Sequence, residues 1–171
     1  MLKPKEFPDA MNDANVQLIE GFYKAFDDGD GKAMAACYAP DVHFSDPVFP
    51  DLRGDRAGAM WQMLTEGPGE VRVELLEHQA DDLTGSAHWL AKYTFSETGR
   101  PVVNDIRAAF VFKDGLIVDH HDDFSFYAWS RQALGPTGLL LGWTPIVKSA
   151  VRKKAAGMLA KYTRTSDNGA K

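Results

Sequence analysis

Cysteine is almost absent from this chain, since Cys37 is the only one among 171 residues. A single thiol has no second cysteine with which to form an intramolecular disulfide or to share a metal ion. Cys37 lies in the apolar stretch AMAACY, where the pattern is typical of a packed helix. We therefore expect a protein of a reducing compartment in which Cys37 has a packing role.

Long apolar runs are also missing. No stretch of 18 apolar residues occurs, and the first ten residues, MLKPKEFPDA, lack the apolar segment that a secretory signal peptide needs. These two absences predict a cytoplasmic protein that does not span a membrane.

Basic residues are in deficit, with 19 Lys and Arg against 24 Asp and Glu. Neutralising the phosphates of a nucleic acid requires a basic surplus, so we expect no nucleic-acid partner. The chain also has no glycine-rich phosphate loop, no nucleophile elbow and no redox cysteine pair, and its five histidines show no known metal-ligand spacing. We therefore expect neither a cofactor nor a metal ion.

The residues that are present predict a folded chain of one domain with an appendage, because 44% are hydrophobic and 11% aromatic. Apolar residues recur at spacings of three and four over 13–27, which predicts a helix. Shorter helices are expected at about 30–38 and 55–65. Between these two, residues 41–46 form a short predicted strand that is closed by proline.

From residue 71 the apolar period changes to two, as in strands. The alternating segments are VRVELLEH, SAHWLAKYTFS, VVNDIRAAFVF and LIVDHHDDFSFY. Three helices before a run of strands predict an α+β domain over 13–128, with a curved antiparallel or mixed sheet wrapped around the helices. Residues 1–12 are expected to be a flexible N-terminus.

Residues 129–163 differ in composition from the rest of the chain. RQALGPTGLLLGWTP is apolar and rich in glycine and proline, and Thr144 followed by Pro145 predicts the start of a helix that runs to about 162. Its apolar stripe consists of Val147, Val151, Ala155, Met158 and Tyr162. Its remaining surface carries Lys148, Arg152, Lys153, Lys154 and Lys161.

We expect the apolar stripe of this helix to dock on its own domain or on a partner subunit. Contact of a basic amphipathic helix with an anionic membrane surface is the alternative. Residues 164–171 are expected to be a disordered tail.

Alternation along the last predicted strand sorts its side chains into two faces. Leu116, Val118, His120 and Asp122 share a face that is otherwise apolar, and the two neighbouring titratable residues, at 121 and 123, share the opposite one. A one-residue slip at a bulge would exchange the two pairs.

The same rule puts Asp46 and Asn104 on the apolar faces of their own strands. A buried charge is costly unless it is paired, shifts its pKa or lines a cavity that is open to ligand. A few polar groups that converge within an aromatic surface typify a small-molecule site, so we expect a pocket for a small apolar molecule. Its expected walls are Phe44, Trp89, Tyr93, Phe110, Tyr23 and Trp61.

Over 13–127 the chain resembles the nuclear transport factor 2-like superfamily, and in particular its SnoaL-like and ketosteroid-isomerase-like branches. The resemblance is carried by FDDGDGKAMAACYAPDVHFSDP, LRGDRAGAMWQML and FVFKDGLIVDHHDDFSF. It implies a cone-shaped α+β fold with an apolar pocket, often in a homodimer. Members include isomerases, epoxide hydrolases, polyketide cyclases and binders without catalysis.

The resemblance implies roles for two acids. Asp46, in FSDP, matches the carboxylate with which ketosteroid isomerases move a proton between carbons, and Asp122, in HHDDF, matches an acid near the end of the last strand of the epoxide hydrolases. The chain also departs from both patterns. Ala108 stands where the isomerases have a protonated acid, and Trp89 and Ala91 stand where the epoxide hydrolases have an Arg-x-Asp pair.

We predict a cofactor-independent acid–base enzyme of the isomerase, cyclase or epoxide-hydrolase type. Asp46 would be the base, Asp122 with the support of His120 would donate or orient, and Asn104 would bind the substrate. The alternatives are that Asp46 only turns the strand end and that the His120–Asp122 pair only fixes the sheet. The whole chain would then be a non-catalytic binding or dimerisation domain.

Overall fold

The computed structural model describes residues 13–169, so the expectations for residues 1–12, 170 and 171 lie outside the described residues. The elements are α1 Asp13–Asp27, α2 Gly31–Ala36, β1 Tyr38–Ser45, β2 Leu52–Arg53, α3 Asp55–Glu66, β3 Arg72–Ala80, β4 Thr84–Phe95, β5 Arg100–Lys113, β6 Leu116–Asp123, α4 Phe126–Ala133, α5 Pro136–Leu141 and α6 Pro145–Gly169.

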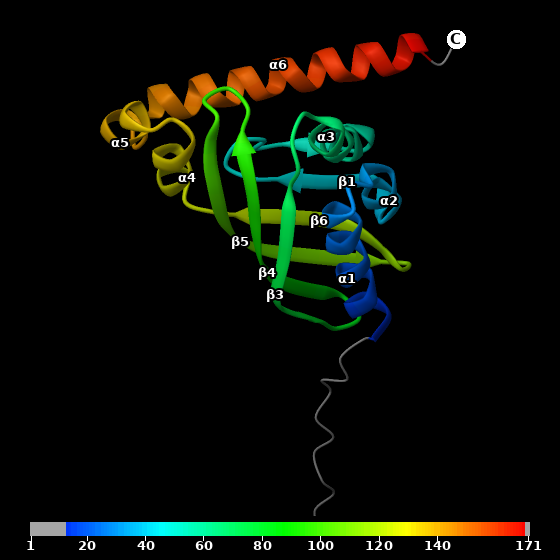
Figure 1. The fold of residues 1–171 in the computed structure, drawn as a ribbon. Helices are drawn as coiled ribbons and strands as arrows, with labels where there is room; N and C mark the ends of the chain where they lie inside the picture. The colour runs from blue at the N-terminus through cyan, green and yellow to red at the C-terminus, as the bar shows by residue number, and fades with distance from the viewer. Residues whose placement is uncertain (1–12, 170–171) are drawn as a thin grey trace, which may run out of the picture.

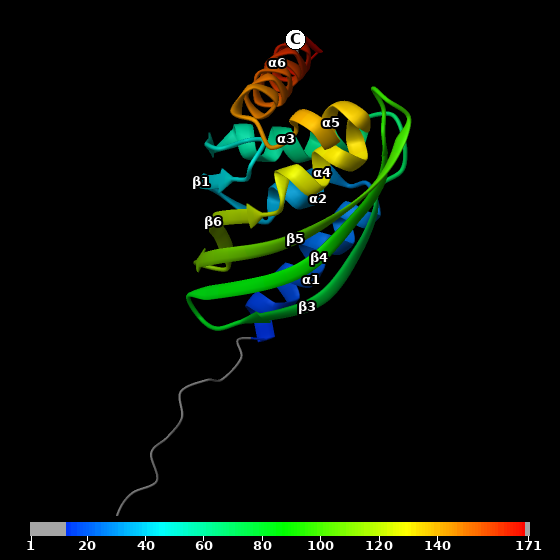
Figure 2. The same ribbon diagram turned by 90° about the vertical axis from the view of Figure 1, so that its left-hand side faces the viewer.

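One mixed sheet organises the domain, with strand order β2-β1-β6-β5-β4-β3. The pairs are antiparallel except for β1 and β6, which run parallel. Figure 2 shows the sheet curving around α1, α2 and α3. The predicted fold class, an α+β cone with a C-terminal helical extension, is confirmed.

The long hairpin of β5 and β6 is built by local sequence. Residues of β5 alternate strictly between buried and exposed from Pro101 onward. The turn that follows places Asp114 at φ 53° and Gly115 at φ 75°, the left-handed conformations that a two-residue hairpin loop requires and that Asp-Gly supplies. The sequence KDG therefore fixes where β6 begins.

A bulge in β6 corrects the predicted face of its first residues. Val111 of β5 pairs with Asp119 but Phe112 pairs with Ile117, so Val118 is an extra residue. As a result Ile117 is fully buried, whereas Leu116 and Val118, which alternation had put on the inner face, are only partly buried. Beyond the bulge the alternation resumes, and the inner face carries His120 and Asp122.

The end of β6 is also corrected. The strand stops at Asp123, and Ser125 begins α4 because its hydroxyl accepts a hydrogen bond from the Ala128 N–H. The prediction of a strand through residue 127 was therefore wrong. Phe126 and Trp129 are buried in a second apolar cluster under α4.

Helix α6 crosses one end of the molecule (Figure 1). Leu159 is fully buried, the Tyr162 hydroxyl donates to Glu66 Oε2 of α3 at 2.8 Å, and Arg152 Nε donates to the Pro47 carbonyl at 2.8 Å. Met158, expected on the docked stripe, is 53% exposed, whereas the neighbouring Leu159 is fully buried.

The helix also continues to Gly169, beyond the expected end near 162 and into the expected tail. No glycine or proline interrupts residues 158–168, which accounts for the continuation.

Candidate active site

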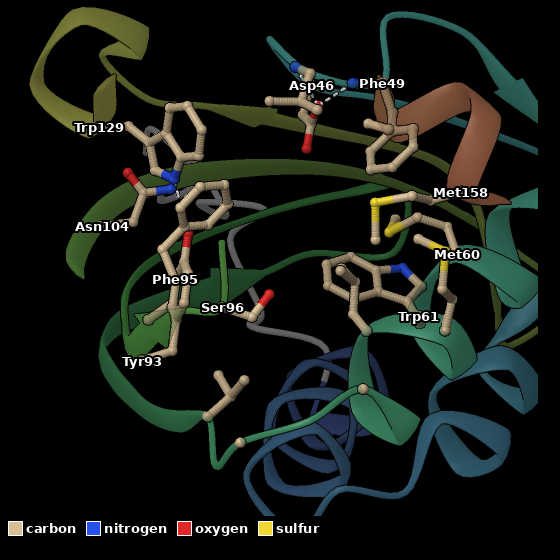
Figure 3. Close-up of a pocket in the computed structure, with 18 of the residues that line it drawn as sticks. Asp46, Phe49, Met60, Trp61, Tyr93, Phe95, Ser96, Asn104, Trp129 and Met158 are labelled. Carbon is tan, nitrogen blue, oxygen red and sulfur yellow. Dashed lines mark hydrogen bonds between the residues drawn. The ribbon is translucent and has the colours of Figure 1, made fainter. Parts of the chain in front are cut away.

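A cavity of about 340 Å³ lies between the inner face of the sheet, α3 and α6 (Figure 3). Most of its wall is apolar. The side chains expected at the site that line it are Asp46, Asp122, Asn104, Trp61, Trp89 and Tyr93. The structure thus brings two acids and one amide from three strands or strand ends to one largely apolar cavity.

The other expected site residues lie behind this wall. Phe44, Phe110, Tyr23 and His120 are buried in the core and do not line the cavity. The His120 ring is surrounded by aromatic rings, with centroid distances of 4.4 Å to Phe110 and 5.1 Å to Phe44. This packing holds the imidazole away from the cavity surface.

The parallel pairing of β1 and β6 brings the two acids together. Ser45 pairs with His121, so the next residues of the two strands, Asp46 and Asp122, follow side by side. Adjacent strands lie about 5 Å apart. The charge of Asp122 accordingly raises the pKa of Asp46.

Asp46 turns the chain at the end of β1. Its Oδ1 accepts from the backbone N–H groups of Val48 at 2.7 Å and Phe49 at 2.5 Å. Asp46 Oδ2 has no hydrogen-bond partner among residues 13–169, and the carboxyl points toward the cavity in Figure 3. Asp46 therefore serves both the turn and the site, because Oδ1 holds the turn and Oδ2 faces the cavity.

Burial decides the protonation of Asp46. Desolvation is the largest influence and raises its pKa from 3.8 to about 7, against the two backbone hydrogen bonds and the Arg152 charge, which lower it. Asp81 provides a comparison, since its Oδ1 accepts from Leu83 N and Thr84 N in the same way. There the same kind of turn stands in water, and the backbone hydrogen bonds lower the pKa of Asp81. The opposite outcome at Asp46 comes from its apolar surroundings.

A row of buried hydrogen bonds ends on Asp122. Trp61 Nε1 donates to the Tyr38 hydroxyl at 2.7 Å, which lies 2.8 Å from His120 Nδ1, and His120 Nε2 lies 3.0 Å from Asp122 Oδ1. His120 is fully buried and Asp122 is 2% exposed. The imidazole therefore positions Asp122 from behind the cavity wall.

The direction of this row follows from its first member. An indole N–H only donates, so the Tyr38 oxygen accepts from Trp61 and its hydrogen must go to His120 Nδ1. Nδ1 is then the acceptor, and Nε2 carries the proton that is donated to Asp122. A proton on Nδ1 would leave the Tyr38 hydrogen without an acceptor among the described residues.

Two buried polar atoms have no hydrogen-bond partner in residues 13–169, the Tyr23 hydroxyl and Trp89 Nε1. Burial is the main cause that raises the pKa of Tyr23 well above its usual value, and Asp122 adds to it. An unsatisfied buried hydroxyl costs about 1–3 kcal/mol.

We predict that Tyr23→Phe raises the free energy of unfolding by about 1 kcal/mol, because it removes a hydroxyl that has no partner. Tyr38→Phe is the matched control, because it removes a hydroxyl that bonds to both Trp61 and His120. It should lower the free energy of unfolding by about 2 kcal/mol. Urea denaturation of the three proteins measures both; equal losses would contradict the assignment of Tyr23.

Asn104 faces the cavity from β5, opposite Ala91 of β4. Its side chain is 8% exposed and has no hydrogen bond to another described residue. Nearby in Figure 3, Trp129 Nε1 donates to the Tyr93 hydroxyl at 2.8 Å. The Tyr93 hydrogen is thereby directed elsewhere and has no acceptor within residues 13–169. Asn104 and Tyr93 can both donate to a ligand.

No group of three or more His, Cys, Asp and Glu in residues 13–169 is arranged to hold a metal ion. The residues that line the cavity supply carboxyl, amide and hydroxyl groups in an apolar wall. Such a wall suits proton transfer on a small molecule.

Residues 19–120 match the family model of the SnoaL-like domain. The chain belongs to the SnoaL-like family. Its fold is that of the wider nuclear transport factor 2-like superfamily, as the resemblance implied. None of the curated proteins matches the chain.

Solved structures share the fold of this SnoaL-like chain. An LEH-like epoxide hydrolase of M. tuberculosis is 20% identical, with a TM-score of 0.60 over 78% of this chain and 95% of that one. A hypothetical protein of Catenulispora acidiphila with a ketosteroid isomerase-like fold, in complex with trimethylamine, is 14% identical, with a TM-score of 0.63 over 75% and 98%. A protein named as a polyketide cyclase from Xanthomonas campestris is 23% identical, with a TM-score of 0.61 over 70% and 96%.

One wall of the SnoaL-like pocket lies outside the matched residues. Val151, Lys154, Ala155 and Met158 of α6 line the cavity, and none of them was expected there. The sequence did carry a signal, since the apolar stripe of this helix predicts that it docks on another surface. The sequence does not indicate which surface receives the helix, because nothing in the strand pattern shows where the open end of the cone lies.

Proposed function

We propose that this SnoaL-like protein is an acid–base enzyme that moves a proton on a small apolar molecule, with Asp46 as the proton carrier. The observation that supports this most is a carboxyl with a pKa of about 7 that faces an apolar cavity. A catalytic acid or base works best when its pKa is near the working pH, because both protonation states are then available.

The cavity supports a compact substrate with one polar end. Its volume of about 340 Å³ is at the small end of the range of ligand pockets, roughly 300 to 1,000 Å³. The Asn104 amide and the Tyr93 hydroxyl are two donors on one side of the cavity that have no acceptor within residues 13–169, whereas Asp46 lies on another part of the wall. A ketone whose oxygen binds the two donors and whose carbon chain extends to Asp46 fits this distribution.

The proposed reaction begins at Asp46 Oδ2. The carboxylate removes a proton from a carbon that the carbonyl group acidifies, directly or through a conjugated double bond. The electron pair of the broken C–H bond moves onto the carbonyl oxygen, where Asn104 and Tyr93 donate hydrogen bonds. Return of the proton from Asp46 to a different carbon, as the carbonyl group re-forms, completes an isomerisation. In a cyclisation the enolate carbon attacks a second carbonyl group instead, and Asp46 gives its proton to the alkoxide oxygen that this attack forms.

Asp122 has a supporting part in this proposal. Its Oδ1 is held by His120, and its charge raises the pKa of Asp46. The second oxygen, Oδ2, has no hydrogen-bond partner among the described residues and can accept one from a substrate hydroxyl. Asp122 therefore orients the substrate and keeps Asp46 basic.

Isotope incorporation tests the proposal without knowledge of the product. The protein is incubated with a panel of apolar ketones and epoxides in D₂O and, separately, in H₂¹⁸O. Mass spectrometry then measures the isotope content of the recovered compounds. Deuterium on carbon supports isomerase or cyclase chemistry, and ¹⁸O in a diol supports epoxide hydrolysis by the same acid. A proton that Asp46 returns to the same molecule leaves no deuterium, so the recovered compounds are also compared with the starting compounds by NMR. If every compound that the protein binds takes up neither isotope and keeps its structure, the enzymatic proposal is overturned.

Binding without turnover is the second candidate. It is favoured by Trp89 and Ala91, which stand where the resemblance to the epoxide-hydrolase branch implies an Arg-x-Asp pair, and by the apolar character of the wall. This candidate predicts that a compound raises the melting temperature, takes up neither isotope and is recovered with its structure unchanged.

A further inference from the structure

The segment between α5 and α6 exposes a cluster of large apolar side chains. They are between 51% and 80% exposed, although such side chains are normally buried. We name this cluster the apolar tip; it consists of Leu139, Leu140, Leu141, Trp143 and Ile146. The tip lies at the end of the molecule that α6 crosses (Figure 1).

Two glycines turn the tip outward. A Cβ atom at Gly138 would lie 1.8 Å from the Ser130 carbonyl oxygen, and one at Gly142 would lie 2.0 Å from Ser130 Oγ. Only glycine allows this close contact, so the side of α5 that carries Gly138 and Gly142 must face α4. The leucines at 139–141 between the two glycines are left to point away from the protein.

The charge of this part of the chain has one sign. Residues 124–166 contain seven basic and no acidic residues, so the rest of this chain of net charge −5 carries −12. Of the seven, only Lys154 forms an ion pair with a described residue, Glu97. The basic residues are Arg131, Lys148, Arg152, Lys153, Lys154, Lys161 and Arg164.

Basic and aromatic groups adjoin the apolar tip. The Lys148 ammonium lies 5.8 Å from the centre of the Phe126 ring, and the Arg131 guanidinium lies 5.6 Å from that of Tyr127. The Tyr127 hydroxyl donates to the Leu139 carbonyl. This combination of side chains matches the layers of a bilayer interface. Apolar side chains suit the acyl chains, tryptophan and tyrosine suit the headgroup region, and cations without an ion-pair partner among the described residues suit the anionic phosphates.

We propose that the apolar tip inserts into the interface of an anionic lipid bilayer while the basic side chains of α4 and α6 bind its headgroups. None of the helices within residues 13–169 is long and apolar enough to cross a membrane, so the contact is peripheral. The proposal does not depend on the acid–base chemistry. The charge of the segment favours a lipid surface over a symmetric dimer in which two tips meet, because the two basic segments would then repel each other.

Trp143 is a built-in reporter for the experiment. It is 72% exposed, whereas Trp61, Trp89 and Trp129 are at most 6% exposed. The full chain is mixed with vesicles of phosphatidylcholine, with or without phosphatidylglycerol. We expect a blue shift of the tryptophan emission, protection from acrylamide quenching and flotation with the vesicles, all dependent on phosphatidylglycerol and weakened by salt.

Variants separate the two parts of the contact. Leu140→Ser with Trp143→Ser should lower the vesicle partition coefficient roughly tenfold or more, and Lys148→Gln with Lys153→Gln at least about fivefold. Leu83→Ser, at a residue 68% exposed in the β3–β4 turn, is the matched control and should change nothing. Equal thermal unfolding of all variants excludes misfolding as a cause.

Two results would overturn the proposal. One is the absence of flotation on anionic vesicles at low salt. The other is a concentration-dependent dimer in sedimentation velocity that Trp143→Ser abolishes and that excludes vesicle binding, since a second copy would then be the occupant of the tip. Loss of isotope incorporation at the active site has no bearing on either measurement, so the two proposals fail separately.

Discussion

Asp46→Asn is expected to lower the rate of proton exchange into a bound substrate by about 10²- to 10⁴-fold, the usual contribution of a general acid or base. The amide oxygen can still accept from the N–H groups of Val48 and Phe49, so the turn after β1 should survive. Because only the basic oxygen is lost, we expect the dissociation constant of the ligand to change little. Initial rates of deuterium incorporation and a ligand titration measure the two quantities.

Asp81→Asn is the matched control for this change. Asp81 makes the same turn with the N–H groups of Leu83 and Thr84, but it does not line the cavity. Deuterium incorporation by Asp81→Asn should be as fast as by the natural protein. In both proteins the rate should rise tenfold per pH unit up to about pH 7 and then level off, because Asp46 must be ionised to act as a base. An Asp46→Asn protein that retains full activity would remove Asp46 from the mechanism.

The second large effect is on stability. The pKa of Asp46 is raised from 3.8 in the unfolded chain to about 7 in the folded protein, so the folded protein retains the proton over an interval in which the unfolded chain has lost it. Stability therefore falls as the pH rises from about 4 to about 7 and is constant above that. The whole interval corresponds to ~4 kcal/mol. Because Asp46 keeps some contact with the open cavity, we expect about half of this value.

The measurement is a difference between two proteins. Urea denaturation of the natural chain and of Asp46→Asn at a series of pH values cancels the titration of the other groups. We expect the free energy of unfolding of Asp46→Asn, relative to that of the natural chain, to rise by about 2 kcal/mol between pH 4 and pH 8. A difference that does not change with pH would mean that Asp46 is ionised at its ordinary pKa.

Much of the fold could be predicted because the spacing of apolar residues within each helix and strand indicates its type. Residues 13–27 and the strand of β5 match their predicted spans closely, and alternation put Asp122 and Asn104 on the inner face. The same alternation along the predicted strand 41–46 put Asp46 on the inner face as well, although β1 runs from Tyr38 to Ser45 and Asp46 follows its end. These are local rules, in which a residue's neighbours in the sequence decide the direction of its side chain.

The start of α4 was missed although its signal is local. Alternation continues through FSFY, but Ser125 accepts a hydrogen bond from the Ala128 N–H and begins a helix. Other features depend on contacts between distant residues. The Val118 bulge is a property of the pairing between β5 and β6 and leaves no pattern in either strand alone. Likewise, the α6 wall of the cavity could not be foreseen, since docking of a helix is decided by the surface that receives it.

The direction of the hydrogen-bond row gives Trp61 an influence on chemistry that occurs elsewhere in the cavity. Its indole N–H determines which nitrogen of His120 holds the proton, His120 in turn supports the negative charge of Asp122, and that charge makes Asp46 a stronger base. Trp61 is also part of the cavity wall. Enlarging the pocket at this position to accept bulkier compounds would therefore retune the proton affinity of Asp46 at the same time, so size selectivity and basicity cannot be engineered independently here.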